Sequence, residues 1–118
     1  MLVRQLNGIK DRQASKIREL AAELVAAGFV SLDEQADALG LSRSTTWTIL
    51  KAKHKNYGLS AALINRVLRN PNLDGRIRAK LIEYVQEKTA GSYGHSHIQR
   101  RRFVRRLADP IGTARDNA

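Results

Sequence analysis

The chain has 118 residues, which is enough for one domain with one core, and 42% of them are hydrophobic, which favours a folded chain over a disordered one. The absence of cysteine excludes disulfides, cysteine-based metal sites and a cysteine nucleophile, and it fits a reducing cytoplasm. No apolar run approaches the roughly 18 residues that span a bilayer, and we expect no signal peptide at the N-terminus. The formal net charge of +10 indicates an acidic partner, most often nucleic acid and less often an anionic membrane surface.

The positive charge is spread unevenly along the chain. Residues 31–60 carry four Lys or Arg against three Asp or Glu, whereas residues 95–118 carry six against two. The excess therefore grows toward the C-terminus, where a charge-driven contact with an acidic partner is expected.

Residues 8–28 are predicted to form the first helix, because apolar residues recur there at three- and four-residue spacing as far as Val25. Gly28 ends this helix. We expect Phe29 and Val30 to pack against the core as the chain leaves it.

Residues 31–50, SLDEQADALGLSRSTTWTIL, carry the most informative pattern: a helix, a tight turn and a second helix. Ala36 supplies the small residue that lets two helices cross closely, and Gly40 tolerates the positive φ that follows a helix end. Ser42 caps the next helix, which is predicted over about 43–52. This arrangement is the helix-turn-helix that places its second helix in the major groove of DNA.

The other helices are predicted from their capping residues and their apolar stripes. Ser31 caps residues 32–39 with Glu34 three positions later, as in a capping box. Ser60 and Asp74 cap two further helices, over 61–69 and from 75 to about 88.

A very basic segment, residues 97–107, is the candidate for a sixth helix, and residues 108–118 are expected to be a frayed tail. The predicted fold is therefore all-α, a compact five-helix bundle with a helix-turn-helix, plus a basic C-terminal helix or tail. We divide the chain into a helical DNA-binding domain, residues 1–92 with the helix-turn-helix at about 31–52, and an arginine-rich extension, residues 93–118.

The segment EQADALGLSRSTTWTIL resembles the DNA-binding headpieces of lac-repressor-type and lambda-repressor-like regulators, and the likeness extends over about residues 29–88. Gln35 and Thr46 stand where such motifs carry buried aliphatic side chains. We expect these two positions either to be less buried in this chain or to hydrogen-bond to each other, because an unpaired buried polar group costs about 1–3 kcal/mol.

A second register is also similar to a lac-repressor-type headpiece. In it, residues 58–60 and 65–68 and Arg78 match the pattern, and residues 61–69 form the helix that contacts bases. We favour the first register because Ala61, Ala62 and Leu63 offer no polar side chains to base edges. The two helices also fit as successive members of one lambda-repressor-like bundle.

In the favoured register, the start of the second helix contacts DNA. Arg43 is expected to bond guanine, and Ser44 and Thr48 lie four residues apart on one face, suited to bases or phosphates. The resemblance implies that Thr45 contacts phosphate or packs at the turn. Trp47 has two interpretations: contact with a thymine methyl or sugar, or burial in the core. Together with the N-terminal N–H groups, the candidates are Ser42, Arg43, Ser44, Thr45, Trp47 and Thr48.

The loop after this helix is basic and is expected to contact phosphates, which position the helix without reading sequence. Its candidate residues are Lys51, Lys53, His54, Lys55, Asn56 and Tyr57.

The densest positive cluster lies in residues 100–106, interrupted by Phe103 and Val104 and followed by Leu107. The segment is suited to docking on the bundle, to lying along the DNA backbone, or to entering a minor groove as an arm. Binding of RNA, binding of a membrane surface, and dimerisation through its apolar residues are further alternatives. The DNA-contact candidates in this segment are Arg100, Arg101, Arg102 and Arg105.

No nucleophile–base pair and no glycine-rich phosphate loop is found in the sequence, and His95 and His97 are too isolated to predict a metal site. We therefore expect no enzyme activity, metal or cofactor. The predicted function is a sequence-specific double-stranded DNA-binding transcriptional regulator of prokaryotic or phage type. It is expected to be cytoplasmic and nucleoid-associated, and to bind a palindromic site as a homodimer. The alternatives are a non-specific architectural or RNA-binding protein acting through the arginine-rich segment, and a protein-interaction module.

Overall fold

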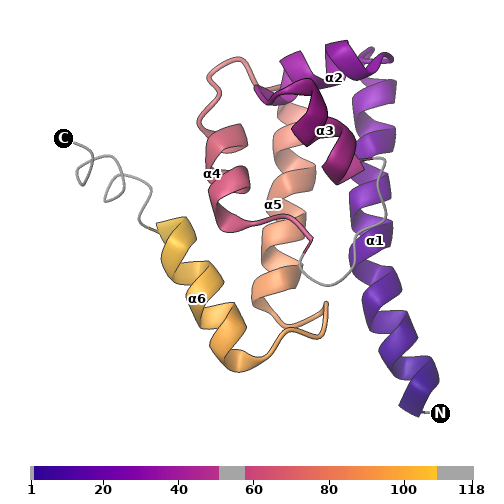
Figure 1. The fold of residues 1–118 in the computed structure, drawn as a ribbon, viewed down its shortest axis with the longest axis vertical. Coiled ribbons are helices and arrows are strands. Elements are labelled where there is room, and N and C mark those ends of the chain that lie inside the picture. The colour runs from indigo at the N-terminus through magenta and orange to yellow at the C-terminus, as the bar shows by residue number, and fades with distance from the viewer. Residues whose placement is uncertain (1, 51–57, 109–118) are drawn as a thin grey trace.

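The computed structural model describes residues 2–50 and 58–108, and these residues form six helices and no strand (Figure 1). The predicted all-α class is confirmed, but the count is six rather than five. The helices are α1 (Leu2–Ala26), α2 (Leu32–Leu39), α3 (Arg43–Leu50), α4 (Ala61–Leu68), α5 (Gly75–Thr89) and α6 (His97–Ala108).

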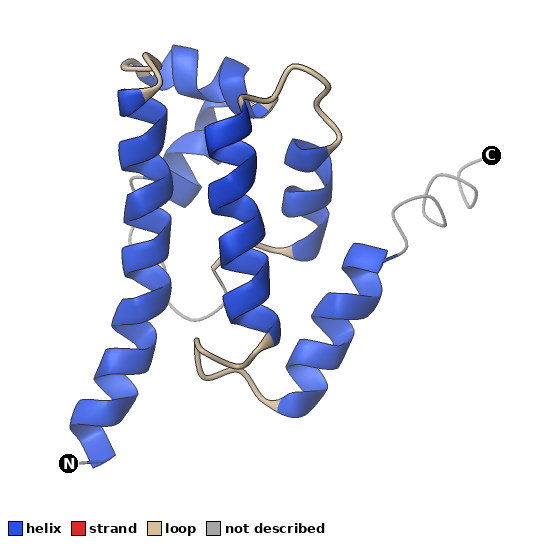
Figure 2. Cartoon of the chain, turned by 180° about the vertical axis from the view of Figure 1, so that it is seen from behind, coloured by secondary structure: helices blue, strands red, loops and turns tan. Residues whose placement is uncertain are grey.

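The two longest helices, α1 and α5, lie side by side and antiparallel in both views (Figures 1 and 2). Four ion pairs between described side chains link them: Arg12 to Glu87 (3.4 Å), Lys16 to Glu83 (3.1 Å) and to Glu87 (3.6 Å), and Lys80 to Glu19 (3.1 Å). The apolar stripes of the two helices, which include Leu24 and Leu81, face the same core. The charged rows lie at the edges of these stripes, where water still reaches them.

The predicted caps of α2 are confirmed. The Ser31 hydroxyl accepts from the Glu34 N–H (3.1 Å), and the Glu34 carboxylate accepts from the Ser31 N–H (2.9 Å). Gly40 follows the helix with φ of 71°, a left-handed conformation that costs glycine nothing. Ala36 is buried, and its carbonyl accepts from the N–H of Leu41 (3.0 Å).

Both expectations for Gln35 and Thr46 were wrong, because both side chains are buried and they do not bond to each other. The Gln35 amide donates to the carbonyl of Phe29 (3.0 Å), and the Thr46 hydroxyl donates to the carbonyl of Ser42 (2.9 Å). Main-chain carbonyls at helix ends and in the adjoining turns supply the acceptors for the Gln35 amide N–H and the Thr46 hydroxyl. The buried Oε1 of Gln35 has no hydrogen-bond partner among the described residues, which weakens the core beneath the motif.

One side chain that follows α1, Val30, was wrongly expected in the core. Val25 and Val30 are exposed, whereas Leu24 is fully buried and Phe29 packs partly against the core. Val25 follows Leu24 by one residue and so points about 100° away from it around the helix. The apolar residues of α1 therefore extend around more of the helix than the face that is buried.

The helix α6 packs on α4 and α5 and contributes to the core, so it is not a free tail. Phe103 is 7% exposed, and the partly buried Leu107 packs beside it. The Asn65 amide on α4 donates to the carbonyl of Arg106 (3.0 Å). Among the described residues, no helix combines the length and the hydropathy that crossing a membrane requires.

Candidate nucleic-acid interface

The helix α3 turns a polar face outward and a small buried face inward. Thr46 and Ile49 are buried, whereas Arg43, Ser44, Trp47 and Thr48 are exposed. The exposed four recur at the spacing of one helical face. Trp47 is 52% exposed, so its interpretation as a core residue was wrong. Trp47 is the largest side chain of this exposed face.

Hydrogen bonds hold the first turn of α3 in place. The Ser42 hydroxyl accepts from the Thr45 N–H (3.2 Å) and donates to the Thr45 hydroxyl (2.8 Å), so the predicted cap is confirmed. The Thr48 hydroxyl donates to the carbonyl of Ser44 (3.0 Å), and its lone pairs can still accept. The first turn is thus rigid, and its hydroxyls offer acceptors to a ligand.

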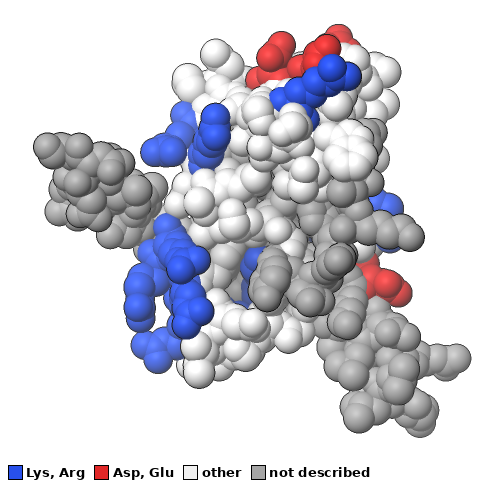
Figure 3. Space-filling view, viewed as in Figure 1, with Lys and Arg blue, Asp and Glu red and all other residues white. Residues whose placement is uncertain are grey.

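The surroundings of α3 are acidic. The Arg43 guanidinium lies 3.4 Å from the Asp33 carboxylate on α2, with the two side chains 70% and 75% exposed. Glu34 and Asp37 are also exposed on α2, and the acidic residues gather at the top of Figure 3. Because so exposed an ion pair contributes little, Arg43 remains available to another anion. The α2–α3 region carries three carboxylates against one arginine, so it attracts phosphate poorly.

The helix α6 has the opposite character. Arg101, Arg102, Arg105 and Arg106 are exposed, and no Asp or Glu lies within the helix. Figure 3 shows Lys and Arg side chains gathered at the lower left, over α6. Arg100 is half-buried and donates to the carbonyl of Thr89 (3.4 Å), so it contributes less to this surface.

In the second register, α4 would contact bases, but few of its side chains are suited to that. Ala61 is buried and Leu63 is half-buried at the start of α4. The Asn65 amide is engaged by the carbonyl of Arg106, because α6 packs on α4. The exposed Arg66 is the charged side chain that α4 still presents to solvent.

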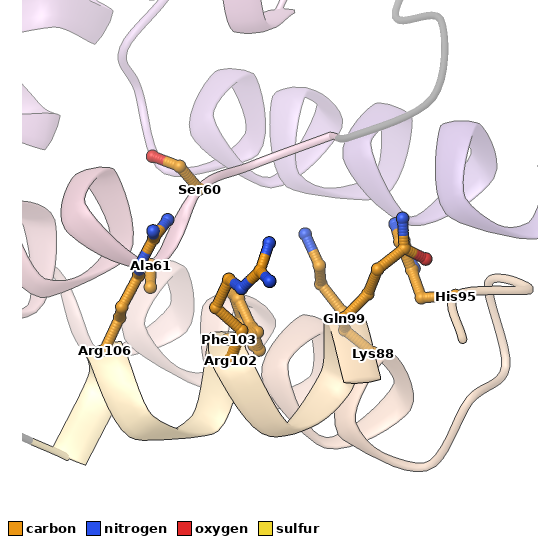
Figure 4. A pocket seen from close by; sticks show the side chains of 8 residues that line it. All are labelled: Ser60, Ala61, Lys88, His95, Gln99, Arg102, Phe103 and Arg106. Atoms are coloured by element: carbon orange, nitrogen blue, oxygen red, sulfur yellow. The ribbon is translucent and has the colours of Figure 1, made fainter. Parts of the chain in front are cut away.

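A pocket of about 240 Å³ lies between α4, α5 and α6 (Figure 4). Lys88 is only 6% exposed there, and its ammonium donates to the carbonyl of Leu59 (2.9 Å) and lies 4.5 Å from the centre of the Phe103 ring. Burial lowers the pKa of Lys88 to about 8. The lining residues are Ser60, Ala61, Lys88, His95, Gln99, Arg102, Phe103 and Arg106.

Sequence analysis predicted only Arg102 among these as a site residue. A signal for Lys88 was present, because it continues the buried stripe of Ile77, Leu81 and Tyr84 at helical spacing. Nothing in the sequence showed that α6 would close over it.

The loop candidates Lys51, Lys53, His54, Lys55, Asn56 and Tyr57 lie outside the described residues. Within the described residues, no three His, Cys, Asp or Glu side chains form a group that could hold a metal ion. No protein-family model, curated protein or solved structure matches the chain.

Proposed function

We propose that this protein is a sequence-specific double-stranded DNA-binding regulator that inserts α3 into the major groove. The observation that carries the proposal is the exposed face of Arg43, Ser44, Trp47 and Thr48 on a capped helix that follows a glycine turn. A polar helical face with a half-exposed tryptophan fits base edges and sugars better than it fits water.

Each side chain of this face has a role in the proposal. Arg43 leaves its exposed pair with Asp33 and donates two hydrogen bonds to guanine. Ser44 and Thr48 bond to bases or phosphates, and Trp47 contacts a thymine methyl or a sugar. The first-turn N–H groups next to Ser42 face a phosphate.

The arginines of α6 supply the charge that α2 and α3 lack. Their contacts with phosphates hold the protein on DNA without reading sequence. One reading helix contacts few base pairs, so we propose a homodimer on a palindrome with half-sites about 34–36 Å apart. A DNA-binding role of this kind implies a location at the nucleoid.

The test is selection of binders from a random duplex library at about 0.15 M salt, where specific and non-specific binding separate. The proposal expects an enriched palindromic motif with the wild-type chain and a relaxed motif with Arg43→Ala. The matched control is Arg101→Gln, which removes one arginine from α6 and should weaken binding without changing the motif. Binding without any enriched motif would contradict the proposal.

A second candidate follows from the concentration of charge on α6. A non-specific architectural or RNA-binding protein needs only that surface, and it would leave α3 without a role. This candidate expects no enriched motif and equal affinity for wild type and Trp47→Ala. The exposed face of α3 is our reason for placing it second.

A further inference from the structure

The pocket between α4, α5 and α6 is lined mainly by positively charged and polar side chains of the described residues, together with Ala61 and Phe103. Lys88, Arg102 and Arg106 line it together with the half-buried His95, and no Asp or Glu is among its lining residues. The charged rows between α1 and α5 pair both signs, whereas a second hollow beside α6 is also cationic and is lined by Thr89, His97, Arg100, Arg101, Val104 and Arg105. The pocket is therefore a site where positive charge is gathered and an anion would be stabilised.

The cationic side chains converge in space. In Figure 4 the side chains of Lys88, Arg102 and Arg106 extend from α5 and α6 toward the segment of Ser60 and Ala61. That segment begins α4, where the helix dipole adds partial positive charge. Gln99 borders the same space and has an amide that can donate. Two helices and the start of a third thus direct donors into one volume.

The energetics of Lys88 agree with an anion at this place. Its ammonium is buried against the Phe103 ring, and desolvation alone lowers its pKa to about 8. A nearby anion favours the charged form and would raise that pKa toward its ordinary value. Binding of the anion and retention of the Lys88 charge would therefore support each other.

The size of the pocket restricts the anion. About 240 Å³ is below the range of roughly 300–1,000 Å³ that holds drug-sized ligands, so the occupant is compact. Arginine pairs and lysine recognise the oxygens of phosphate through charge-assisted hydrogen bonds. We propose that this pocket binds a phosphate group, held by Arg102, Arg106 and Lys88. The group belongs either to a small phosphorylated molecule or to a nucleic-acid backbone.

The test measures inorganic phosphate and glycerol phosphate binding to the full chain by titration calorimetry, against sodium chloride at equal ionic strength. The double variant Arg102→Gln/Arg106→Gln removes two pocket arginines. The matched control, Arg101→Gln/Arg105→Gln, removes two exposed arginines of the same helix that do not line this pocket. Both variants change the net charge equally, and all four side chains are exposed, so we expect the fold to be retained.

The proposal expects phosphate to bind wild type and the control variant with similar affinity, and the pocket variant at least about tenfold more weakly. Equal weakening in both variants would overturn it, because charge alone would then explain the binding. No binding of phosphate beyond that of chloride to the wild-type chain would overturn it as well.

A second arm separates the two sources of the phosphate. If a nucleic-acid backbone supplies it, duplex DNA competes with inorganic phosphate, and the pocket variant loses more DNA affinity than the control variant. If a small molecule supplies it, the two variants lose DNA affinity equally. Phosphate binding is measured without DNA, so the inference can hold when the DNA-binding proposal fails, and the reverse.

Discussion

The α2–α3 region and α6 divide between them two properties that a nucleic-acid-binding protein needs. The α2–α3 region has a varied exposed face with arginine, hydroxyls and tryptophan, but it carries three carboxylates against one arginine, and one of them pairs with Arg43. The helix α6 has five arginines and no carboxylate, but its exposed face is chemically uniform. Varied donors discriminate among bases, whereas uniform positive charge attracts any phosphate. In the proposed function, recognition of bases would thus lie on α3 and non-specific binding of phosphates on α6.

The two regions also use their aromatic residues in opposite ways. Trp47 on α3 is half exposed, whereas Phe103 on α6 is buried under the Lys88 ammonium. The aromatic residue of α6 therefore fixes the helix to the bundle, whereas that of α3 remains half in solvent. The difference predicts that mutations in α6 alter stability and mutations in α3 alter recognition.

The largest expected effect is on stability at α6. Phe103→Ala removes a buried ring from the contact with α4 and α5, which costs about 3–5 kcal/mol in the free energy of unfolding. Urea unfolding followed by circular dichroism measures it. The matched variant Trp47→Ala should cost under about 1 kcal/mol, because that side chain is half exposed. Similar losses of unfolding free energy in the two variants would contradict the different roles assigned to Phe103 and Trp47.

The burial of Lys88 under α6 should make stability depend on pH. Burial lowers the pKa of Lys88 to about 8, whereas the unfolded chain keeps the ordinary value of 10.5. The unfolded state therefore binds more protons between these values, and stability rises with pH from about 8 to about 10, by at most about 1.4 kcal/mol per pH unit.

Urea unfolding at several pH values checks this rise, with Lys88→Met as the reference because it cannot titrate. Above about pH 10 the raised pKa of the buried Tyr84, which burial causes, acts in the opposite direction, so the window ends there. A wild-type profile that parallels that of Lys88→Met would show that the ammonium is not desolvated.

Recognition is expected to change at Arg43. Arg43→Ala should cost about 1–3 kcal/mol of discrimination at one base pair, because a bidentate contact to guanine is lost. Arg101→Gln/Arg105→Gln should instead weaken binding to every sequence and reduce the salt slope by about 2. Binding measured on the selected site and on single-base variants distinguishes them. If both variants lose affinity without losing discrimination, α3 does not read sequence.

The capping box of Ser31 and Glu34 stabilises the start of α2. Ser31→Ala removes the acceptor for the Glu34 N–H and should cost about 1 kcal/mol in the free energy of unfolding. Ser60→Ala at the start of α4 is the matched comparison, because the Ser60 hydroxyl caps Leu63 in the same way (3.2 Å). Thermal unfolding measures both, and a stabilised Ser31→Ala variant would contradict the role of the box.

The smallest expected effect concerns the acidic surroundings of Arg43. Asp33→Asn removes the partner of an exposed ion pair, so stability should change by less than about 1 kcal/mol. Affinity for DNA should rise a few-fold for all sequences, because one repulsive charge is lost and Arg43 is released. A fall in affinity would show that Asp33 positions Arg43 for its contact.

The capped starts of α2, α4 and α5 were predicted from the sequence, because caps are local, whereas α1 runs from Leu2 to Ala26 and not over the predicted residues 8–28. Ser31, Glu34 and Gly40 each act within four residues of their partners, so their roles could be read from spacing. The hydrogen-bond partners of Gln35 and Thr46 could not be predicted from residue spacing. A polar residue at such a position can lie in solvent, bond to another side chain or bond to the main chain, and the structure shows main-chain acceptors.

Only the parts of the candidate site that depend on local sequence were predicted. The outward face of α3 follows from helical periodicity, whereas the exposure of Trp47 depends on which neighbour lies beside it. The α6 arginines were visible as a charge cluster. Their association with Lys88 and Ser60 brings together residues separated by up to 46 positions, which no local pattern encodes.

By itself, the sequence determined the all-α class, the glycine turn at Gly40, the caps and the excess of positive charge, because backbone conformation and net charge depend on each residue and its near neighbours. Only the tertiary structure decided that α6 docks through Phe103, that Lys88 is buried beneath it and that Trp47 remains in solvent. These outcomes depend on the packing of helices distant in the chain, where burial of apolar area outweighs local preference.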